Sequence, residues 1–230
     1  DYLLMYNNYN WSYMEKIGCD SRRMRTIHNS LDTSLQTKIY STLKPSSIFK
    51  EHFGNDNPVV ISIRRIQKRK KVEQIVESLL MGKKQGFEFN LVIVGLDQDN
   101  GSVLRMVEQY GLSKNVWFYG PCFDENVNAQ LLYDSSVCVC PSEVGLTAIH
   151  ALSYGCPVIS NDNFEKQMPE FESIIEGKTG SFFRENDIED LLNKIKYWCC
   201  LSETGRDKTR NDARKLILNE WSIDYQINVL

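Results

Sequence analysis

The fold of this chain is decided by the stretch Val137-Cys138-Val139-Cys140-Pro141-Ser142-Glu143-Val144-Gly145-Leu146-Thr147. Its first four residues are all apolar, as in a strand that is buried on both faces of a parallel sheet. The residues from about 146 to 154 have the apolar spacing of a helix, and Gly145 stands just before them. A buried strand that leads through a short turn into a helix is the repeating unit of α/β proteins.

The same alternation of short apolar runs and longer amphipathic stretches continues from Pro58 onward. The expected strands are Val59–Ile63, Leu91–Val94, Val116–Tyr119, Val137–Cys140, Pro157–Ser160 and Gly180–Phe183. The expected helices cover about 70–84, 100–111, 126–134, 146–154, 187–201 and 206–220. Six strands that alternate with helices predict a doubly wound, six-stranded parallel sheet of the Rossmann-like α/β class.

The N-terminal part of the sequence has a different organisation. Asp1–Tyr6 and Met24–His28 predict two strands on either side of a helix near 10–17, a unit too small to bury its own faces. We therefore interpret residues 1–45 as the remnant of an upstream domain with a connector, 46–220 as the main domain and 221–230 as a tail that packs back. The sequence starts at Asp1, without Met and without a charged and then apolar leader, so we expect no signal peptide and a piece of a longer protein.

Composition excludes several classes of protein. The chain has 230 residues, of which 42% are hydrophobic and 25% are charged, so a packed core is expected rather than disorder. Lysine and arginine number 27 and aspartate and glutamate number 30, which leaves a net charge of −3 and no global field for nucleic acid. No apolar run approaches the roughly 20 residues that span a bilayer.

The cysteines and histidines favour a reducing compartment without a metal site. Seven cysteines are present, and no two have C-x-x-C spacing, so a cytoplasmic location is expected. Cys138 and Cys140 lie in an apolar run, and we expect them to be buried. His28, His52 and His150 are scattered and none lies near a cysteine pair, so no metal is expected.

Doubly wound sheets bind ligands at the carboxyl ends of their strands, where the winding direction reverses. If the six strands, numbered along the chain, lie in the order 3-2-1-4-5-6, the reversal falls between the first strand and the fourth. The first strand leads into Arg64 and Arg65, and the fourth leads into the glycine-started helix at Gly145. Guanidinium groups on one side and free helical N–H groups on the other both favour an anion such as a diphosphate. The alternatives are a solvated basic face around 64–71 and a glycine that only allows close packing.

Other nucleotide and hydrolase motifs are missing. The sequence contains no G-x-S-x-G, no Walker loop and no G-x-G-x-x-G, which disfavours hydrolases, nucleotide triphosphatases and dehydrogenases. His150 could serve as a base or a ligand, but a histidine on a helix face that hydrogen-bonds a neighbouring residue is an equal alternative.

The segment Pro141–Ile159 resembles the signature of the retaining glycosyltransferases of family four, which is roughly P-S-x-x-E-x-F-G-L-x-x-x-E-A-M-A-x-G-x-P-V-I. These enzymes have the two-domain GT-B fold. Further segments resemble family elements in the same order, namely N-G-x-D at Asn29–Asp32, R-L-x-x-x-K at Arg65 and Lys70, a strand with glycine at Leu91–Gly95, F-x-G at Trp117–Gly120 and D-G-x-T-G at Glu176–Gly180. The resemblance covers nearly the whole chain.

The resemblance implies the C-terminal, nucleotide-sugar-binding half of a GT-B enzyme, preceded by the last strand–helix–strand of the acceptor domain. Arg65 and Lys70 would be the catalytic residues, because they contact the donor diphosphate. The backbone at Gly145, Leu146 and Thr147 would hold phosphate or sugar. The segment Gly120, Pro121 and Cys122 would frame the base.

The sequence departs from the family at two glutamates that are normally spaced E-x7-E. Ser142 stands at the first position, which normally meets the donor sugar, and His150 at the second, which normally binds the ribose hydroxyls. Glu143 lies one residue beyond the first of these positions. Arg64 stands where the family has a glycine before its arginine. These changes mark either a divergent branch with an unusual donor or a weakened enzyme, and the intact anion-binding parts favour the branch.

The implied function is a retaining, metal-independent hexosyltransferase that builds a bacterial surface polysaccharide. The donor substrate would be a UDP- or GDP-sugar, with no other cofactor. A glycan or lipid-linked acceptor would bind through the missing N-terminal domain, and the full-length protein would associate peripherally with a membrane. This piece alone is expected to be inactive. The alternatives are a non-catalytic nucleotide-sugar-binding module and a GT-B sugar epimerase.

Overall fold

The computed structural model describes residues 1–230, and its centre is a six-stranded sheet. The strands are β3 (Val59–Ile63), β4 (Asn90–Val94), β5 (Val116–Gly120), β6 (Val137–Cys140), β7 (Val158–Asn161) and β8 (Gly180–Phe183). Every neighbouring pair is parallel, and the order is β5-β4-β3-β6-β7-β8. This arrangement confirms the predicted fold class, and its order is the 3-2-1-4-5-6 order that was assumed in locating the crevice.

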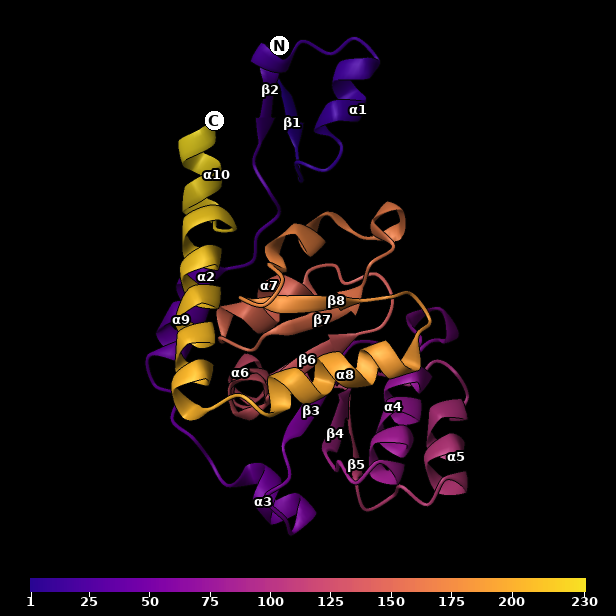
Figure 1. Ribbon diagram of the computed structural model, residues 1–230. Helices are drawn as coiled ribbons and strands as arrows, with labels where there is room; N and C mark the ends of the chain where they lie inside the picture. The colour runs from indigo at the N-terminus through magenta and orange to yellow at the C-terminus, as the bar shows by residue number, and fades with distance from the viewer.

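Helices cover both faces of the sheet (Figure 1). One face carries α4 (Glu73–Lys84), α5 (Ser102–Gln109) and α8 (Ile188–Cys199). The other carries α6 (Glu125–Asp134), α7 (Thr147–Ser153) and α9 (Glu203–Glu220). Successive strand residues point to opposite faces, so in β3 Ile61 joins the core under α6, α7 and α9, while Val60 joins the core under α4, α5 and α8.

Local sequence explains where these helices form. In α4 the side chains of Ile75, Val76 and Leu79 lie on one face of the helix and are at 0% exposure. The helix α8 begins after Asp187, because the Asp187 carboxylate accepts a hydrogen bond from the Asp190 N–H at 2.9 Å. Cys138 and Cys140 are buried, as predicted, and all seven cysteines are free thiols.

The N-terminal unit contains a two-stranded sheet. The strands β1 (Leu3–Met5) and β2 (Met24–Thr26) pair in parallel, and α1 (Trp11–Lys16) connects them. One contact with the main domain is made by Glu172, whose carboxylate accepts hydrogen bonds from the backbone N–H groups of Asn8 and Tyr9 at 2.8 and 2.5 Å.

The connector contains two helices that the sequence analysis did not predict. They are α2 (Thr33–Tyr40) and α3 (Ile48–Phe53). Asp32 caps α2, because its carboxylate accepts a hydrogen bond from the Leu35 N–H at 3.0 Å. The buried face of α2 includes the polar side chains of Thr33 and Gln36. The sequence therefore has no apolar stripe that would predict this helix.

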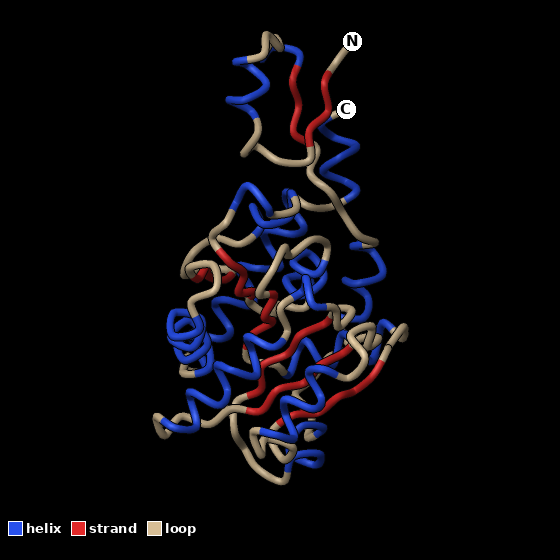
Figure 2. Tube along the Cα trace, turned by 90° about the vertical axis from the view of Figure 1, so that its right-hand side faces the viewer, coloured by secondary structure: helices blue, strands red, loops and turns tan.

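The C-terminal residues pack back onto the N-terminal unit. The helix α9 ends at Glu220, Trp221 follows it, and α10 (Ile223–Val229) comes next. The Gln226 side-chain amide donates to the His28 carbonyl at 2.7 Å, and the His28 ring lies 4.1 Å from the Trp221 ring, centroid to centroid. Figure 2 accordingly shows both chain ends at the same end of the molecule. None of the helices combines the length and apolar character that crossing a membrane requires.

Candidate functional site

The candidate site lies at the carboxyl ends of β3 and β6, the two central strands. The chain leaves β3 toward β4 on one side, and it leaves β6 toward β7 on the other. A crevice opens between two such strands because their connections diverge. The predicted position of the site therefore coincides with a real switch point of the sheet.

Two adjacent arginines follow β3 and have different environments. Arg64 is 9% exposed, and its guanidinium donates to the Glu143 carbonyl at 2.6 Å and to the Ser142 hydroxyl at 3.3 Å. Arg64 thus ties the β3 side of the crevice to the β6 side. Arg65 is exposed, and its side chain makes no hydrogen bond or ion pair within the chain. Arg65 is the arginine that can offer its charge to a ligand.

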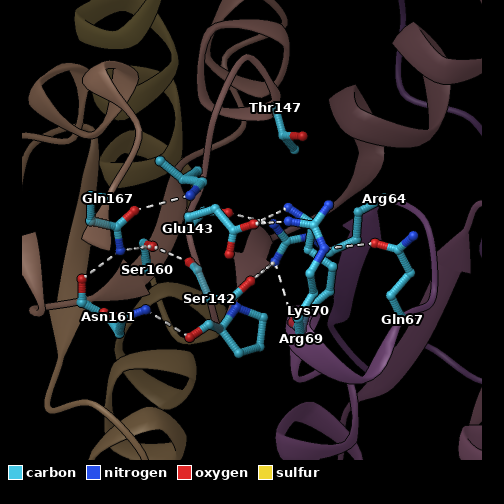
Figure 3. A network of polar contacts seen from close by, with 12 residues as sticks. Arg64, Gln67, Arg69, Lys70, Ser142, Glu143, Thr147, Ser160, Asn161 and Gln167 are labelled. Carbon is cyan, nitrogen blue, oxygen red and sulfur yellow. Dashed lines mark hydrogen bonds and ion pairs between the residues drawn. The ribbon is translucent and has the colours of Figure 1, made fainter.

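Lys70 is paired with a carboxylate from the opposite side of the crevice (Figure 3). Its ammonium nitrogen lies 2.5 Å from Oε1 of Glu143, and Arg69 reaches the same oxygen at 3.0 Å. Burial alone would raise the pKa of Glu143, but the hydrogen bonds from Lys70 and Ser142 outweigh it, so the pKa lies below its ordinary value. In the sequence, Glu143 stands out only as a displaced family glutamate.

A cavity of about 380 Å³ lies between these cations and the start of α7 (the cation cavity). Arg65 and Lys70 line one wall, and Gly145, Leu146 and Thr147 line the other. The backbone N–H groups of these last three residues have no hydrogen-bond partner in the chain. Gly145 has a φ of +56°, in the left-handed region that favours glycine. Cations facing unpaired N–H groups can bind an anion.

The loop between β6 and α7 is held from behind by the end of β7 and by the segment that follows it (Figure 3). The Gln167 side-chain oxygen accepts a hydrogen bond from the Val144 N–H at 3.0 Å. The Ser160 hydroxyl donates to the Ser142 carbonyl at 3.0 Å, and the Asn161 amide donates to the Pro141 carbonyl at 2.9 Å. The wall of the cation cavity is therefore a fixed backbone rather than a free loop.

A second cavity of about 450 Å³ adjoins the first, on the side of β4 and β5 (the apolar cavity). Pro121 and Cys122 line it, as do Gly95 and Phe123, whose side chain is 95% exposed at the rim. Gly120 ends β5 with a φ of +85° and accepts a hydrogen bond from the Gly95 N–H at 2.9 Å. An apolar pocket with one aromatic side chain at its edge suits a flat ring.

A third cavity of about 400 Å³ lies between α2, α6 and α7 (the carboxylate cavity). His150 lines it, and its Nε2 is 3.0 Å from Oε1 of Glu125. The Tyr154 hydroxyl donates to the same oxygen at 2.6 Å. Because an ionised carboxylate only accepts hydrogen bonds, Nε2 of His150 carries the proton, and this nitrogen is not free to accept one from a ligand.

Glu125 is a candidate residue that the sequence analysis missed. Burial would raise its pKa, but the hydrogen bond and the charge of His150 outweigh that effect, so the pKa lies below its ordinary value. The available signal was its position as the first residue of α6, three residues beyond Cys122. The second family glutamate is absent from α7, where this chain has His150. Glu125 of α6 places a carboxylate beside that histidine.

The three cavities are joined by shared residues. Arg64 and Arg65 line both the cation cavity and the apolar cavity, and Leu146 and Thr147 line both the cation cavity and the carboxylate cavity. The structure therefore brings most of the predicted site residues together, namely Arg65, Lys70, Pro121, Cys122, Gly145, Leu146, Thr147 and His150. Ser142 lies behind the wall, where it accepts a hydrogen bond from Arg64, and Gly120 supports the apolar cavity through Gly95.

No group of three or more histidine, cysteine, aspartate or glutamate side chains is arranged to hold a metal ion. The positive charge of the site comes from arginine and lysine.

Two curated proteins are similar to this chain in sequence. WcaL of Escherichia coli (strain K12), named for colanic acid biosynthesis as a glycosyltransferase, is 24% identical over 177 residues, which are 70% of this chain and 42% of WcaL. An uncharacterized 41.2 kDa protein in the cps region of Klebsiella pneumoniae is 22% identical over 225 residues, 94% of this chain and 58% of that protein. The chain therefore spans about half the length of these relatives.

Solved structures share the fold. A glycosyltransferase from Rickettsia africae superposes with a TM-score of 0.77 at 17% identity, covering 99% of this chain and 61% of its own. Anabaena HepE, solved in complex with UDP, superposes with a TM-score of 0.75 at 16% identity, covering 99% and 62%. The sequence model of the family described as glycosyl transferases group 1 matches residues 44–216, well over half of the chain. The chain belongs to this family, the glycosyl transferases group 1.

Proposed function

We propose that this chain binds the nucleotide-sugar donor of a retaining hexosyltransferase. The observation that carries the proposal is the cation cavity, where Arg65 and Lys70 face three unpaired backbone N–H groups at the switch point of the sheet. A diphosphate is the donor's anionic part, and it matches this arrangement in charge and in hydrogen-bond acceptors. The acceptor substrate would bind mainly to the part of the longer protein that this sequence does not include.

The reaction needs no nucleophile from the protein. As the bond between the sugar and the diphosphate breaks, negative charge grows on the diphosphate. An acceptor hydroxyl attacks from the same face of the sugar and passes its proton to the departing diphosphate or to a base in the rest of the longer protein. Arg65, Lys70 and the N–H groups of Gly145–Thr147 would stabilise that charge from fixed positions. These groups carry the role that a divalent metal has in other transferases, so we infer metal-independent binding.

The nucleoside part would occupy the other two cavities. The apolar cavity, with Pro121, Cys122 and Phe123, suits the base. The carboxylate cavity suits the ribose, because the Glu125 carboxylate can accept hydrogen bonds from neighbouring hydroxyls. HepE, which has the same fold, was solved with UDP, and this supports a uracil nucleotide as the first probe.

Calorimetry with UDP, GDP, UMP and GMP tests this assignment. Both diphosphates should bind more tightly than the matching monophosphates, because the cations face the second phosphate. Addition of EDTA should leave the affinities unchanged. Equal affinity for monophosphates and diphosphates would contradict the roles of Arg65 and Lys70.

The names of the relatives support a place in polysaccharide assembly. WcaL is named for colanic acid biosynthesis, and the Klebsiella protein lies in a cps region. We infer that the longer protein extends a surface polysaccharide on a glycan or lipid-linked acceptor. The test is transfer of labelled sugar by the longer protein to lipid-linked acceptors in membrane extracts, with this 230-residue chain as the inactive control.

A non-catalytic nucleotide-sugar-binding module is the second candidate. It is favoured by one observation, the presence of Ser142 and His150 at the two positions where the family has glutamates. Binding of UDP-sugars without any transfer or hydrolysis by the longer protein would support this module.

A further inference from the structure

Two cations that line the cation cavity, Arg69 and Lys70, already have a charged partner within the chain. Oε1 of Glu143 bonds the Lys70 ammonium at 2.5 Å and the Arg69 guanidinium at 3.0 Å. Glu143, Arg69 and Lys70 all line the cation cavity. A ligand phosphate that binds to Lys70 must therefore compete with a carboxylate that belongs to the protein.

The backbone on both sides of this carboxylate is fixed. The Glu143 carbonyl accepts a hydrogen bond from Arg64 at 2.6 Å, and the Val144 N–H donates to Gln167 at 3.0 Å. The carbonyl of Ser142 accepts from Ser160 at 3.0 Å. The Glu143 side chain, by contrast, is 21% exposed and has three rotatable bonds. Its carboxylate can leave Lys70 by a rotamer change alone, without movement of the loop.

The chemistry of the exchange favours a diphosphate. Lysine presents three rotatable donors on a flexible chain, so its ammonium can turn from a carboxylate to a phosphate oxygen. A diphosphate carries more charge and more acceptor oxygens than a carboxylate, so it can bond Lys70 and Arg65 together. Arg65 has no partner in the chain and is ready for that ligand.

We propose that Glu143 is an internal counter-ion, which the donor's diphosphate displaces from Lys70 and Arg69. The carboxylate balances the charge of the empty site and lowers the affinity of Lys70 and Arg69 for anions. This inference rests on the proposed function of the cation cavity. It assigns to Glu143 a competing role, so removal of its charge strengthens ligand binding instead of weakening it.

The test is calorimetry with inorganic pyrophosphate, which has the diphosphate but no base or sugar. Glu143→Gln should tighten pyrophosphate binding about fivefold, which corresponds to about 1 kcal/mol for a partly exposed ion pair. The matched control is Glu185→Gln. Glu185 is paired with Lys71 at 3.0 Å and has a side-chain exposure of 24%, but it does not line the cation cavity. The control makes the same change in net charge and should alter the affinity by less than about twofold.

Lys70→Met makes the test specific to the displaced pair. In the Lys70→Met background, Glu143→Gln should have a smaller effect than in the wild type, because the main partner of the carboxylate is already absent. If Glu143→Gln changes pyrophosphate affinity equally in both backgrounds, the ligand does not displace Glu143 from Lys70 and the proposal is wrong. Thermal unfolding of each variant checks that the fold is retained.

The outcomes separate this inference from the proposed function. If wild-type protein binds pyrophosphate in a Lys70-dependent way and Glu143→Gln leaves the affinity unchanged or weakens it, the counter-ion role is wrong and the diphosphate site stands. If neither the wild type nor Glu143→Gln binds pyrophosphate or UDP, both are overturned. Tighter binding by Glu143→Gln but not by Glu185→Gln supports both.

Discussion

The cation cavity and the carboxylate cavity share a wall but differ in charge. Leu146 and Thr147 line both. Apart from that wall, the cation cavity is lined by cationic side chains, namely Arg64, Arg65, Arg69 and Lys70. The carboxylate cavity is lined by Asp32 and Glu125 and by no lysine or arginine. A ligand that reaches both must be anionic at one end and neutral, with hydrogen-bond donors, at the other. A nucleoside diphosphate has this distribution, whereas an inorganic anion or a free sugar satisfies only one cavity.

The largest effect is expected from Arg65→Ala, which removes an unpaired cation from the cation cavity. Loss of one preorganised charge-stabilising group typically costs about 2.7–4 kcal/mol in the transition state. Turnover by the longer protein should fall accordingly, and pyrophosphate binding to this chain should weaken. Lys68→Ala is the matched control, because Lys68 is an exposed cation of the same segment that does not line the cavity. If both variants lose the same activity, the segment is only a solvated basic face.

A smaller and selective effect is expected from Glu125→Gln in the carboxylate cavity. Its affinity for UDP should fall about tenfold, about 1.4 kcal/mol, because an ionised acceptor for the ribose hydroxyls is lost. Its affinity for pyrophosphate should stay the same. His150→Ala should have the same selectivity and a lesser size, since His150 acts on the ligand mainly through Glu125.

Glu108→Gln on the exposed side of α5 is the control for the change in charge. Calorimetry with UDP and pyrophosphate on all four proteins gives the comparison. If UDP and pyrophosphate weaken together in Glu125→Gln, the two cavities do not divide the ligand in the proposed way.

The smallest effect concerns the pH dependence of stability. It involves Glu125 in the carboxylate cavity and Glu143 in the cation cavity. The pKa values of Glu125 and Glu143 lie below the ordinary value of 4.5, so both groups bind protons less readily when folded. Their contribution to stability is present above that value and is lost as the pH falls through the lower folded pKa. We expect each Glu→Gln variant to lose about 0.5–1 kcal/mol of unfolding free energy at pH 7 and less at pH 4. Urea unfolding at both pH values measures this, and a deficit that grows at pH 4 would contradict the stated direction.

The strands could be predicted because they are buried on both faces. Val137–Cys140 and Gly180–Phe183 have the same bounds in the sequence analysis and in the structure. The helix α2 could not be predicted, because its buried face carries Thr33 and Gln36 and is set by packing against α6 and α7. Its only strong sequence signal is the cap at Asp32.

The juxtaposition of Arg65 and Gly145 could be predicted, but the ion pairs around the cavities could not. The strand order places Arg65 and Gly145 on opposite sides of one crevice, and the structure does so. The pairing of Lys70 with Glu143 joins residues 73 positions apart, and that of His150 with Glu125 joins residues 25 positions apart. Such pairs depend on side-chain directions that become defined only after the sheet has assembled.

The pairing of β3 has a consequence for folding kinetics. Five residue pairs join β3 to β4, its neighbour in the sequence, but only Val60–Val137 and Ile61–Cys138 join it to β6. Long loops cost entropy to close, so distant strand pairs form after local ones. The half with β3–β5 carries Lys70, and the half with β6–β8 carries Glu143 and Gly145. Neither half contains a complete cation cavity, so a refolding chain gains its ligand affinity only when the two halves dock.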